Sequence, residues 1–222
     1  CVDPDDDGDG DGDDTDCAPL DSAVYNGATE ICDGVDQNCN GLLDEYGQCS
    51  GCSDGSREGF TNIAAYPEVA ACSGGWSVPG VLSTVTPACN RNSGDDSNNP
   101  SGAGCNVADL CAPGWHVCAS SADFSQHAPA GCGGLSAAPG LFFASRQSGP
   151  GSKDCGSGAN DLFGCGTLGD APNGSCSPFT QFSQNLCSIL GAPWSCGSDG
   201  YQEANNVTKA SSAKGGVLCC LD

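Results

Sequence analysis

The chain has 222 residues, of which 19 are cysteines, and a formal net charge of −22. Cysteine at this density is typical of secreted domains that are held together by disulfides, and it argues against a reducing cytosol. The acidic charge excludes nucleic acids and anionic lipid surfaces as partners, since both require clusters of Lys and Arg, and no apolar run is long enough for a membrane span.

The acidic charge is concentrated in the N-terminal part. Residues 1–50 contain fifteen acidic residues and no Lys or Arg, whereas residues 51–222 contain thirteen acidic and six basic residues. We therefore expect two parts: an acidic calcium-binding module at 1–50 and a cysteine-rich globular α+β domain at 51–222.

The stretch DPDDDGDGDGDDTD, residues 3–16, has the spacing of a calcium loop. Counted from Asp5, oxygen donors fall at loop positions 1, 3, 5, 9 and 12, with glycine at position 6 for the sharp turn and a backbone carbonyl at position 7. The alternative is a solvated acidic tail without a bound ion. The predicted ligands are Asp5, Asp7, Asp9, Asp13 and Asp16, together with the carbonyl of Asp11.

A second calcium loop is predicted within DGVDQNCNGLLDE, residues 33–45, so that about two calcium ions are expected in all. Position 12 of this loop is Gly47, which has no side-chain oxygen, so Glu45, Asp21 or Glu30 would have to supply the last ligand. The other predicted ligands, at positions 1, 3, 5, 7 and 9, are Asp36, Asn38, Asn40, the carbonyl of Leu42, and Asp44.

Two family resemblances rest on these residues. DPDDDGDGDGDDTDC is similar to the aspartate-rich loops of thrombospondin type 3 repeats. Residues 1–49 as a whole resemble the metal-binding motif of secreted bacterial proteins named after MopE, on the acidic spacing, the centre NGATEICDGVD and the flanking cysteines. The resemblance implies a calcium-stapled module at the bacterial cell surface. Copper is part of that family's name, but residues 1–50 contain neither His nor Met to bind it.

The cysteines near the two loops are expected to form disulfides. Cys1 and Cys17 bracket the first loop, and Cys32 and Cys39 bracket the start of the second, which favours these two pairs, although spacing does not fix connectivity. Zinc is the rival explanation for so many cysteines, but the spacings are irregular and only two histidines are available. Nineteen is an odd number, so one cysteine is expected to be free or bonded elsewhere.

The globular domain is expected to contain short strands, long loops and two helices. Short apolar segments such as WSVPGVLSTV and GGVLCC, separated by turn residues, predict the strands. One helix is predicted in 120–128, where Ser120 precedes Asp123 by three places as an N-cap. The other is predicted in 177–190, where Ser177 and Pro178 precede apolar residues at helical spacing.

Two segments of this domain, one near its middle and one at its end, are similar to C-type-lectin-like folds. CAPGWHVCASSADF, residues 111–124, is similar to their opening strand and helix, and residues 194–220 to their closing strand, although the Glu-Pro-Asn and Trp-Asn-Asp motifs that bind calcium and sugar are absent. Cys219 and Cys220 are neighbours whose side chains would point to opposite faces of a strand. We therefore expect them to have two different partners.

The sequence does not indicate an enzyme. It lacks the G-x-S-x-G, H-E-x-x-H and P-loop motifs. His116 in GWHVC is the one candidate base, and we interpret it as a strand residue bonded to a backbone carbonyl. Trp76, Trp115 and Trp194 have the shape to stack on sugars, but we interpret them as core residues.

Two functions remain in competition. In the first, the chain is a non-enzymatic structural protein, secreted or at the cell surface, whose calcium module docks head-to-tail on the next copy to build an extracellular bacterial filament or surface assembly. In the second, it is a carbohydrate-binding or adhesion module with structural calcium, and cell-surface glycans are its partners.

Overall fold

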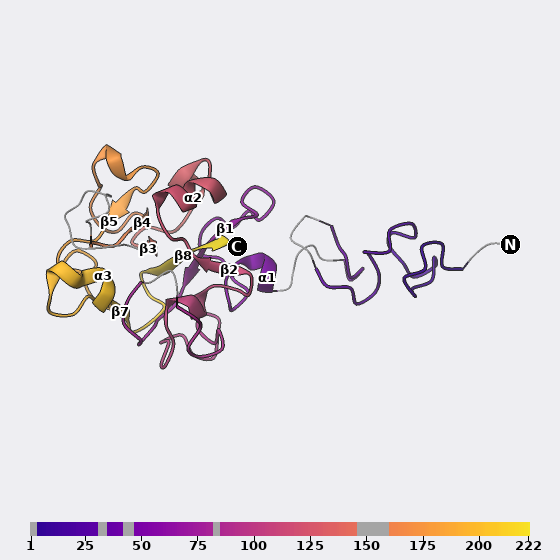
Figure 1. Ribbon diagram of the computed structural model, residues 1–222, viewed down its shortest axis with the longest axis horizontal. Coiled ribbons are helices and arrows are strands. Elements are labelled where there is room, and N and C mark those ends of the chain that lie inside the picture. Colours follow the sequence, from indigo (N-terminus) through magenta and orange to yellow (C-terminus); the bar gives the residue numbers. More distant parts are fainter. Residues whose placement is uncertain (1–3, 31–34, 42–46, 82–84, 146–159) are drawn as a thin grey trace.

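The computed structural model describes residues 4–30, 35–41, 47–81, 85–145 and 160–222. The described residues from 47 onward form a globular body, and those from 4 to 41 extend from it as an arm (Figure 1). No helix or strand occurs in the described residues of the arm. We use the names arm and body for these two parts.

The helices and strands of the body are short, as the sequence predicts. The strands are β1 (Val69–Ser73), β2 (Trp115–Val117), β3 (Phe142–Ser145), β4 (Phe163–Gly166), β5 (Gln181–Phe182), β6 (Trp194–Ser195), β7 (Thr208–Lys209) and β8 (Gly215–Leu221). The α-helices are α1 (Gly47–Ser50), α2 (Ser121–His127) and α3 (Glu203–Asn206), and the 3-10 helices are Val107–Leu110, Gly131–Gly134, Gly174–Cys176 and Gly200–Gln202.

A six-stranded mixed sheet organises the body. β8 pairs with three strands: antiparallel with β1 and β2, and parallel with β3. Beyond β3 the sheet continues through β4 to β5, and β6 and β7 form a separate antiparallel pair. The body is thus a mixed α/β structure with few helices, and a lectin-like arrangement is not confirmed.

Hydrophobic clusters cover both faces of this sheet. Side chains alternate along β8, so that Val217 and Cys219 belong to one cluster and Leu218 and Cys220 to the other. All four side chains are fully buried. A strand buried on both faces reads as a continuous apolar run, which explains the segment GGVLCC.

Seven disulfides join described residues, and this number is typical of an extracellular protein. Cys219 and Cys220 have different partners on opposite faces of the sheet, which confirms the prediction for this pair. The seven disulfides are Cys17–Cys39, Cys52–Cys72, Cys89–Cys105, Cys111–Cys219, Cys118–Cys220, Cys132–Cys165 and Cys187–Cys196. None of the helices in these parts of the chain is long and apolar enough to cross a lipid bilayer.

The helix predicted in 120–128 is confirmed as α2. The hydroxyl of Ser120 accepts a hydrogen bond from the backbone N–H of Asp123 (3.1 Å), which is the expected N-cap. Phe124 is fully buried and packs edge-on against Phe60, at 6.1 Å between ring centroids.

The helix predicted in 177–190 is wrong. The segment instead contributes β5 to the sheet. Phe179 stacks on Phe124 and Phe182 stacks on Phe163, whereas Leu186 is 43% exposed, so the apolar residues serve separate neighbours and do not form one helical face. Tertiary packing overrides the local helical pattern here.

A buried carboxyl pair lies behind this segment. The hydroxyl of Ser183 and the backbone N–H of Cys187 donate to Oε1 of Glu203, at 2.8 and 2.7 Å. Oε2 of Glu203 has no hydrogen-bond donor. Burial, and then repulsion from Glu203, raises the pKa of the neighbouring Asp161 to about 7.

Candidate metal centre

Three aspartates of the first predicted loop converge. Carboxylate oxygens of Asp5, Asp7 and Asp9 lie within 4.8 Å of one another. The chain can turn this tightly because Gly8 and Gly10 take the left-handed conformation, with φ of 78° and 99°. Both N–H groups donate to the Asp5 carboxylate, at 2.8 and 3.2 Å.

Two oxygens of this triad lack a donor. Oδ2 of Asp7 and Oδ2 of Asp9 are shielded from water and accept no hydrogen bond from a residue that the structure describes. Burial raises the pKa of Asp7, and the nearby carboxylates of Asp9, Asp16 and Asp5 raise it further, against a lowering backbone hydrogen bond from Asp9. Anionic oxygens in this state require a proton or a cation, and oxygen ligands alone suit a hard divalent cation.

The carboxylates of Asp11 and Asp13 make structural contacts; the ligand predicted at Asp11 is its backbone carbonyl, which these contacts do not involve. Oδ1 of Asp11 accepts a hydrogen bond from Thr15 Oγ1 (2.6 Å), and Oδ2 accepts one from the Asn26 N–H (2.9 Å). The Thr15 hydroxyl, followed by the Asn26 backbone, holds the pKa of Asp11 below its usual value. Asp13 Oδ1 accepts a hydrogen bond from the Asp6 N–H (2.9 Å), which closes the loop.

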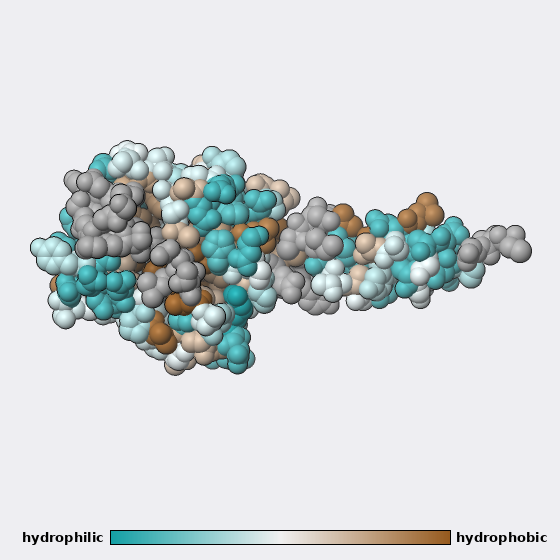
Figure 2. All heavy atoms as spheres, in the orientation of Figure 1, coloured by the Kyte–Doolittle hydropathy of each residue, from teal (hydrophilic) through white to brown (hydrophobic). Residues whose placement is uncertain are grey.

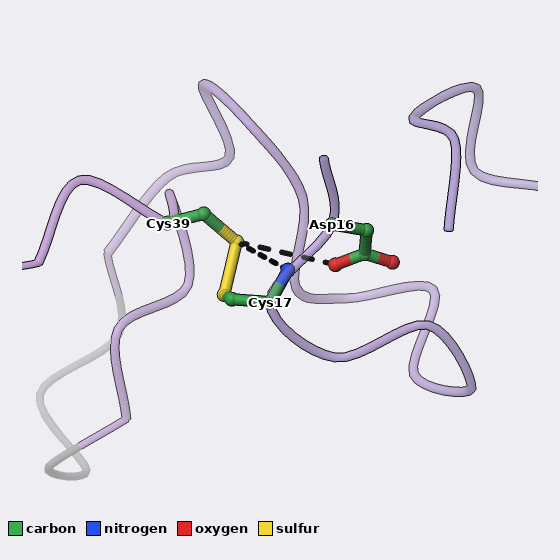
Figure 3. A group of neighbouring side chains, drawn as sticks. All are labelled: Asp16, Cys17 and Cys39. Atoms are coloured by element: carbon green, nitrogen blue, oxygen red, sulfur yellow. Dashed lines mark hydrogen bonds between the residues drawn. A yellow bond between two sulfur atoms is a disulfide. The ribbon is translucent and has the colours of Figure 1, made fainter. Parts of the chain in front are cut away.

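The remaining predicted ligand, Asp16, lies beside a disulfide between the two loops (Figure 3). Its Oδ1 accepts a hydrogen bond from the Ala18 N–H (2.8 Å) and lies 3.9 Å from Sγ of Cys39. Cys39 is bonded to Cys17, and their Cα atoms are 5.6 Å apart. This bridge fastens the end of the first loop to the middle of the second.

The pairings predicted for these cysteines are therefore wrong. Cys17 does not pair with Cys1, and Cys39 does not pair with Cys32; both proposed partners lie outside the described residues. The reason is that the segment between the loops folds back on the second loop. Its Tyr25 N–H donates a hydrogen bond to the Gln37 carbonyl (2.8 Å), and this contact lies close in sequence to Cys39 of the disulfide.

The second loop repeats the hydrogen-bond pattern of the first. At position 1, the Asp36 carboxylate accepts a hydrogen bond from the N–H at position 6, Gly41, at 2.7 Å. At position 3, Asn38 Oδ1 accepts one from the N–H at position 5, Asn40, at 3.2 Å. Asp5 and Asp7 make the corresponding contacts in the first loop, at 3.2 Å each. The first six positions of both loops, which the structure describes, therefore share one hydrogen-bond pattern.

Glu30 reaches the second loop, as one of the three candidates for its last ligand. It is 4% exposed, and its Oε1 accepts a hydrogen bond from the Asn38 N–H (2.9 Å). Asp21 instead accepts one from the N–H of Ala23 (3.2 Å) in its own exposed turn. The predicted ligands Leu42 and Asp44, and the third candidate Glu45, lie outside the described residues.

His116, the candidate base in the body, has different hydrogen-bond partners from those predicted. His116 lies on β2 as expected, but its ring contacts two carboxylates and not a backbone carbonyl. One of these, Asp123, also faces His127, the second histidine of the chain. The i, i+4 spacing of Asp123 and His127 on α2 is the signal in the sequence that indicates this contact.

The three tryptophans belong to the core, as interpreted. Trp76, Trp115 and Trp194 are 0%, 2% and 4% exposed. Their faces are used in packing: Trp76 and Trp194 meet edge to face at 5.4 Å. None of them offers an open ring surface on which a sugar could stack.

Comparison with known families supports a metal site in the arm. Residues 16–45 match the family model Cu-binding_MopE, described as a "Putative metal-binding motif". The matched stretch includes the second loop, Glu30 and the Cys17–Cys39 disulfide, but only Asp16 of the first loop's ligands. No solved structure matches the chain.

Proposed function

We propose that the arm binds calcium at its two loops and that the protein is a non-enzymatic structural subunit of an extracellular assembly. The observation that carries the calcium proposal is the Asp5, Asp7 and Asp9 triad with its two shielded oxygens that lack a donor. A bound cation would contact both oxygens and offset the repulsion among the three carboxylates.

Calcium fits these loops better than copper does. The side chains gathered in both loops offer carboxylate and amide oxygens, and residues 1–50 contain no His or Met. Copper favours imidazole and sulfur ligands, whereas calcium takes six to eight oxygens in flexible geometry. The Cys17 and Cys39 sulfurs are already joined in a disulfide and are not thiolate ligands. Extracellular calcium modules of this kind bind at roughly 10⁻⁴–10⁻³ M.

Replacing Asp7 and Asp9 with Asn tests the calcium proposal. We expect calorimetric titration of the full chain to show weaker calcium binding by the first loop, because Asn keeps an oxygen at positions 3 and 5, as Asn38 and Asn40 do in the second loop, but removes two negative charges. The matched control is Asp6→Asn with Asp14→Asn, since these carboxylates are exposed in the same arm. Equal binding by both double variants would contradict calcium in the first loop.

Assembly through the arm is supported by the way the arm projects from the body (Figure 1). The surface of the arm is mainly hydrophilic, with isolated hydrophobic residues (Figure 2), and Leu20 and Val35 are 82% and 44% exposed. Single apolar side chains are normal on a protein surface and do not by themselves mark an interface. Contact between the arm and the body of the next copy would generate an open head-to-tail assembly.

Negative-stain electron microscopy with calcium and after chelation tests this assembly. We expect fibres or sheets that dissociate in chelator, since the loops lose their shape without the ion.

The carbohydrate-binding alternative is supported by a pocket of about 310 Å³ that is lined in part by Ser77, Ser101 and Thr208. Monomers in both conditions that are retained on a glycan array would favour that alternative.

A further inference from the structure

Two carboxyl groups meet in the interior of the body. Glu203 is the first residue of α3 and is 0% exposed, and Asp161 lies just before β4 and is 4% exposed. Their side chains are hydrogen-bonded to each other. Since two ionised carboxylates can only accept hydrogen bonds, this contact requires a shared proton or a cation between the oxygens. None of the described basic side chains forms an ion pair with either residue.

The donors around Glu203 reach only one of its oxygens. The Ser183 hydroxyl and the Cys187 N–H donate to Oε1. Oε2 is shielded from water, and no N–H or hydroxyl group of the described residues donates to it. Burial, followed by repulsion from Glu203, raises the pKa of Asp161 to about 7. The protein groups around the pair therefore stabilise one negative charge and leave the second without compensation.

A third oxygen at the same junction lacks a donor. Asn160 is 1% exposed, and its Oδ1 is shielded from water and accepts no hydrogen bond from a described residue. The other polar groups of Asn160 join two segments: its carbonyl accepts a hydrogen bond from the Ala204 N–H (3.0 Å), and its Nδ2 donates to the Tyr201 carbonyl. The segment before β4 is thus fastened to the start of α3, with buried side-chain oxygens on both.

We propose that the carboxylates of Asp161 and Glu203 bind a calcium ion in the body, separately from the two loops of the arm. The ion takes the place of the shared proton and contacts Oε2 of Glu203. Calcium suits carboxylate and amide oxygens and tolerates irregular geometry. The sulfurs of Cys187 and Cys196 lie within 4.8 Å of a Glu203 oxygen, but they are joined in a disulfide, so a metal that prefers thiolates has no ligand there.

Calcium at this pair makes the stability of the body depend on the ion. It ties the segment before β4 to α3, and a ligand that binds only the folded chain stabilises it. In metal-free protein one shared proton takes the place of the ion, and the pair is then sensitive to pH. The body site and the proposed arm sites share no residue, so each can be removed without the other.

Thermal unfolding of the full chain, followed by tryptophan fluorescence, tests the site, because all three tryptophans lie in the core of the body. We expect about 10 mM calcium at pH 8 to raise the melting temperature of the parent by about 5 °C or more. Asp161→Asn and, separately, Glu203→Gln should weaken the site at least about tenfold and remove about half or more of this increase, since each removes a charge but keeps an oxygen. The matched control is Asp170→Asn, which removes an exposed carboxylate of the body.

A second set of measurements separates this site from the arm and from misfolding. The arm variant with Asp7→Asn and Asp9→Asn should keep the full increase, so failure of the arm proposal and failure of this one are distinguishable. Without calcium, Asp161→Asn should melt no earlier than the parent, because Asn removes the repulsion with Glu203. A parent that gains no stability from calcium, an equal gain in Asp161→Asn and the control, or a gain abolished in the arm variant would overturn the proposal.

Discussion

Replacing all four cysteines of the Cys111–Cys219 and Cys118–Cys220 disulfides with alanine is expected to lower the free energy of unfolding by about 7 kcal/mol. The two bridges span 108 and 102 residues and close almost the same loop. When one is removed, the other still closes it, and only a small ring of about nine residues is released. Each single removal should therefore cost about 2.5 kcal/mol, because the entropy of closure depends on loop length.

The test is urea unfolding of the parent, the two single-bridge variants and the variant without both bridges. The variant without both bridges should lose about 2 kcal/mol more free energy of unfolding than the two single-bridge variants lose together. This excess is expected when two crosslinks close the same loop. Simple additivity would contradict this account of how β8 is held. The Cys89–Cys105 bridge, which closes a separate loop, is the control.

Raising the pH from 4 to 8 is expected to destabilise the protein through Asp161. Burial and repulsion from Glu203 raise the pKa of Asp161 from 3.8 to about 7. Between these values the folded protein keeps a proton that the unfolded chain releases, so this contribution is most favourable below about pH 4 and is lost as the pH rises through 7. The loss should amount to about 2–4 kcal/mol for a residue that is 4% exposed.

Asp161→Asn isolates this effect. The variant should be more stable than the parent at pH 8 and should lack the decline between pH 4 and 7, because Asn does not ionise. Urea midpoints across this pH range, in parent and variant, are the measurement. Carboxylates remote from Asp161 titrate in both proteins and cancel in the difference; Glu203 is the exception, since the substitution removes its repulsion with Asp161. Parallel stability curves would show that the pair does not titrate as described.

The sequence is most informative where geometry leaves few choices. Adjacent residues on a strand point to opposite faces, which was enough to predict separate partners for Cys219 and Cys220. The N-cap of α2 could be predicted because the hydrogen bond from the Asp123 N–H to Ser120 is local. These features depend on neighbours in the chain and not on distant contacts.

Features that depend on distant contacts were not predictable. The helical pattern in 177–190 is real, but Phe182 stacks on Phe163 of β4 and Cys187 is bonded to Cys196. The Cys17–Cys39 pairing depends on how the segment between the loops folds back. The spacing of residues along the sequence predicts neither the packing of 177–190 nor the Cys17–Cys39 pairing.

The candidate site also has features that could be predicted from local spacing and features that depend on distant contacts. Loop positions could be counted from the sequence, and the triad of Asp5, Asp7 and Asp9 follows from that spacing and from the glycines between them. The contacts of the Asp11 side chain could not be predicted, because its carboxylate accepts a hydrogen bond from Asn26, fifteen residues further along the chain. His116 and His127 come from separate elements, so only the packing of β2 against α2 places them together.

The position of β8 determines when folding can be completed. This strand, residues 215–221, supplies hydrogen bonds to β1, β2 and β3, which are all synthesised earlier. A polypeptide emerging from a ribosome or a translocation channel therefore leaves these three strands without their common neighbour, and Cys111 and Cys118 without their sulfur partners, until residues 215–221 have emerged. The sheet can close, and these two disulfides can form, only after that point.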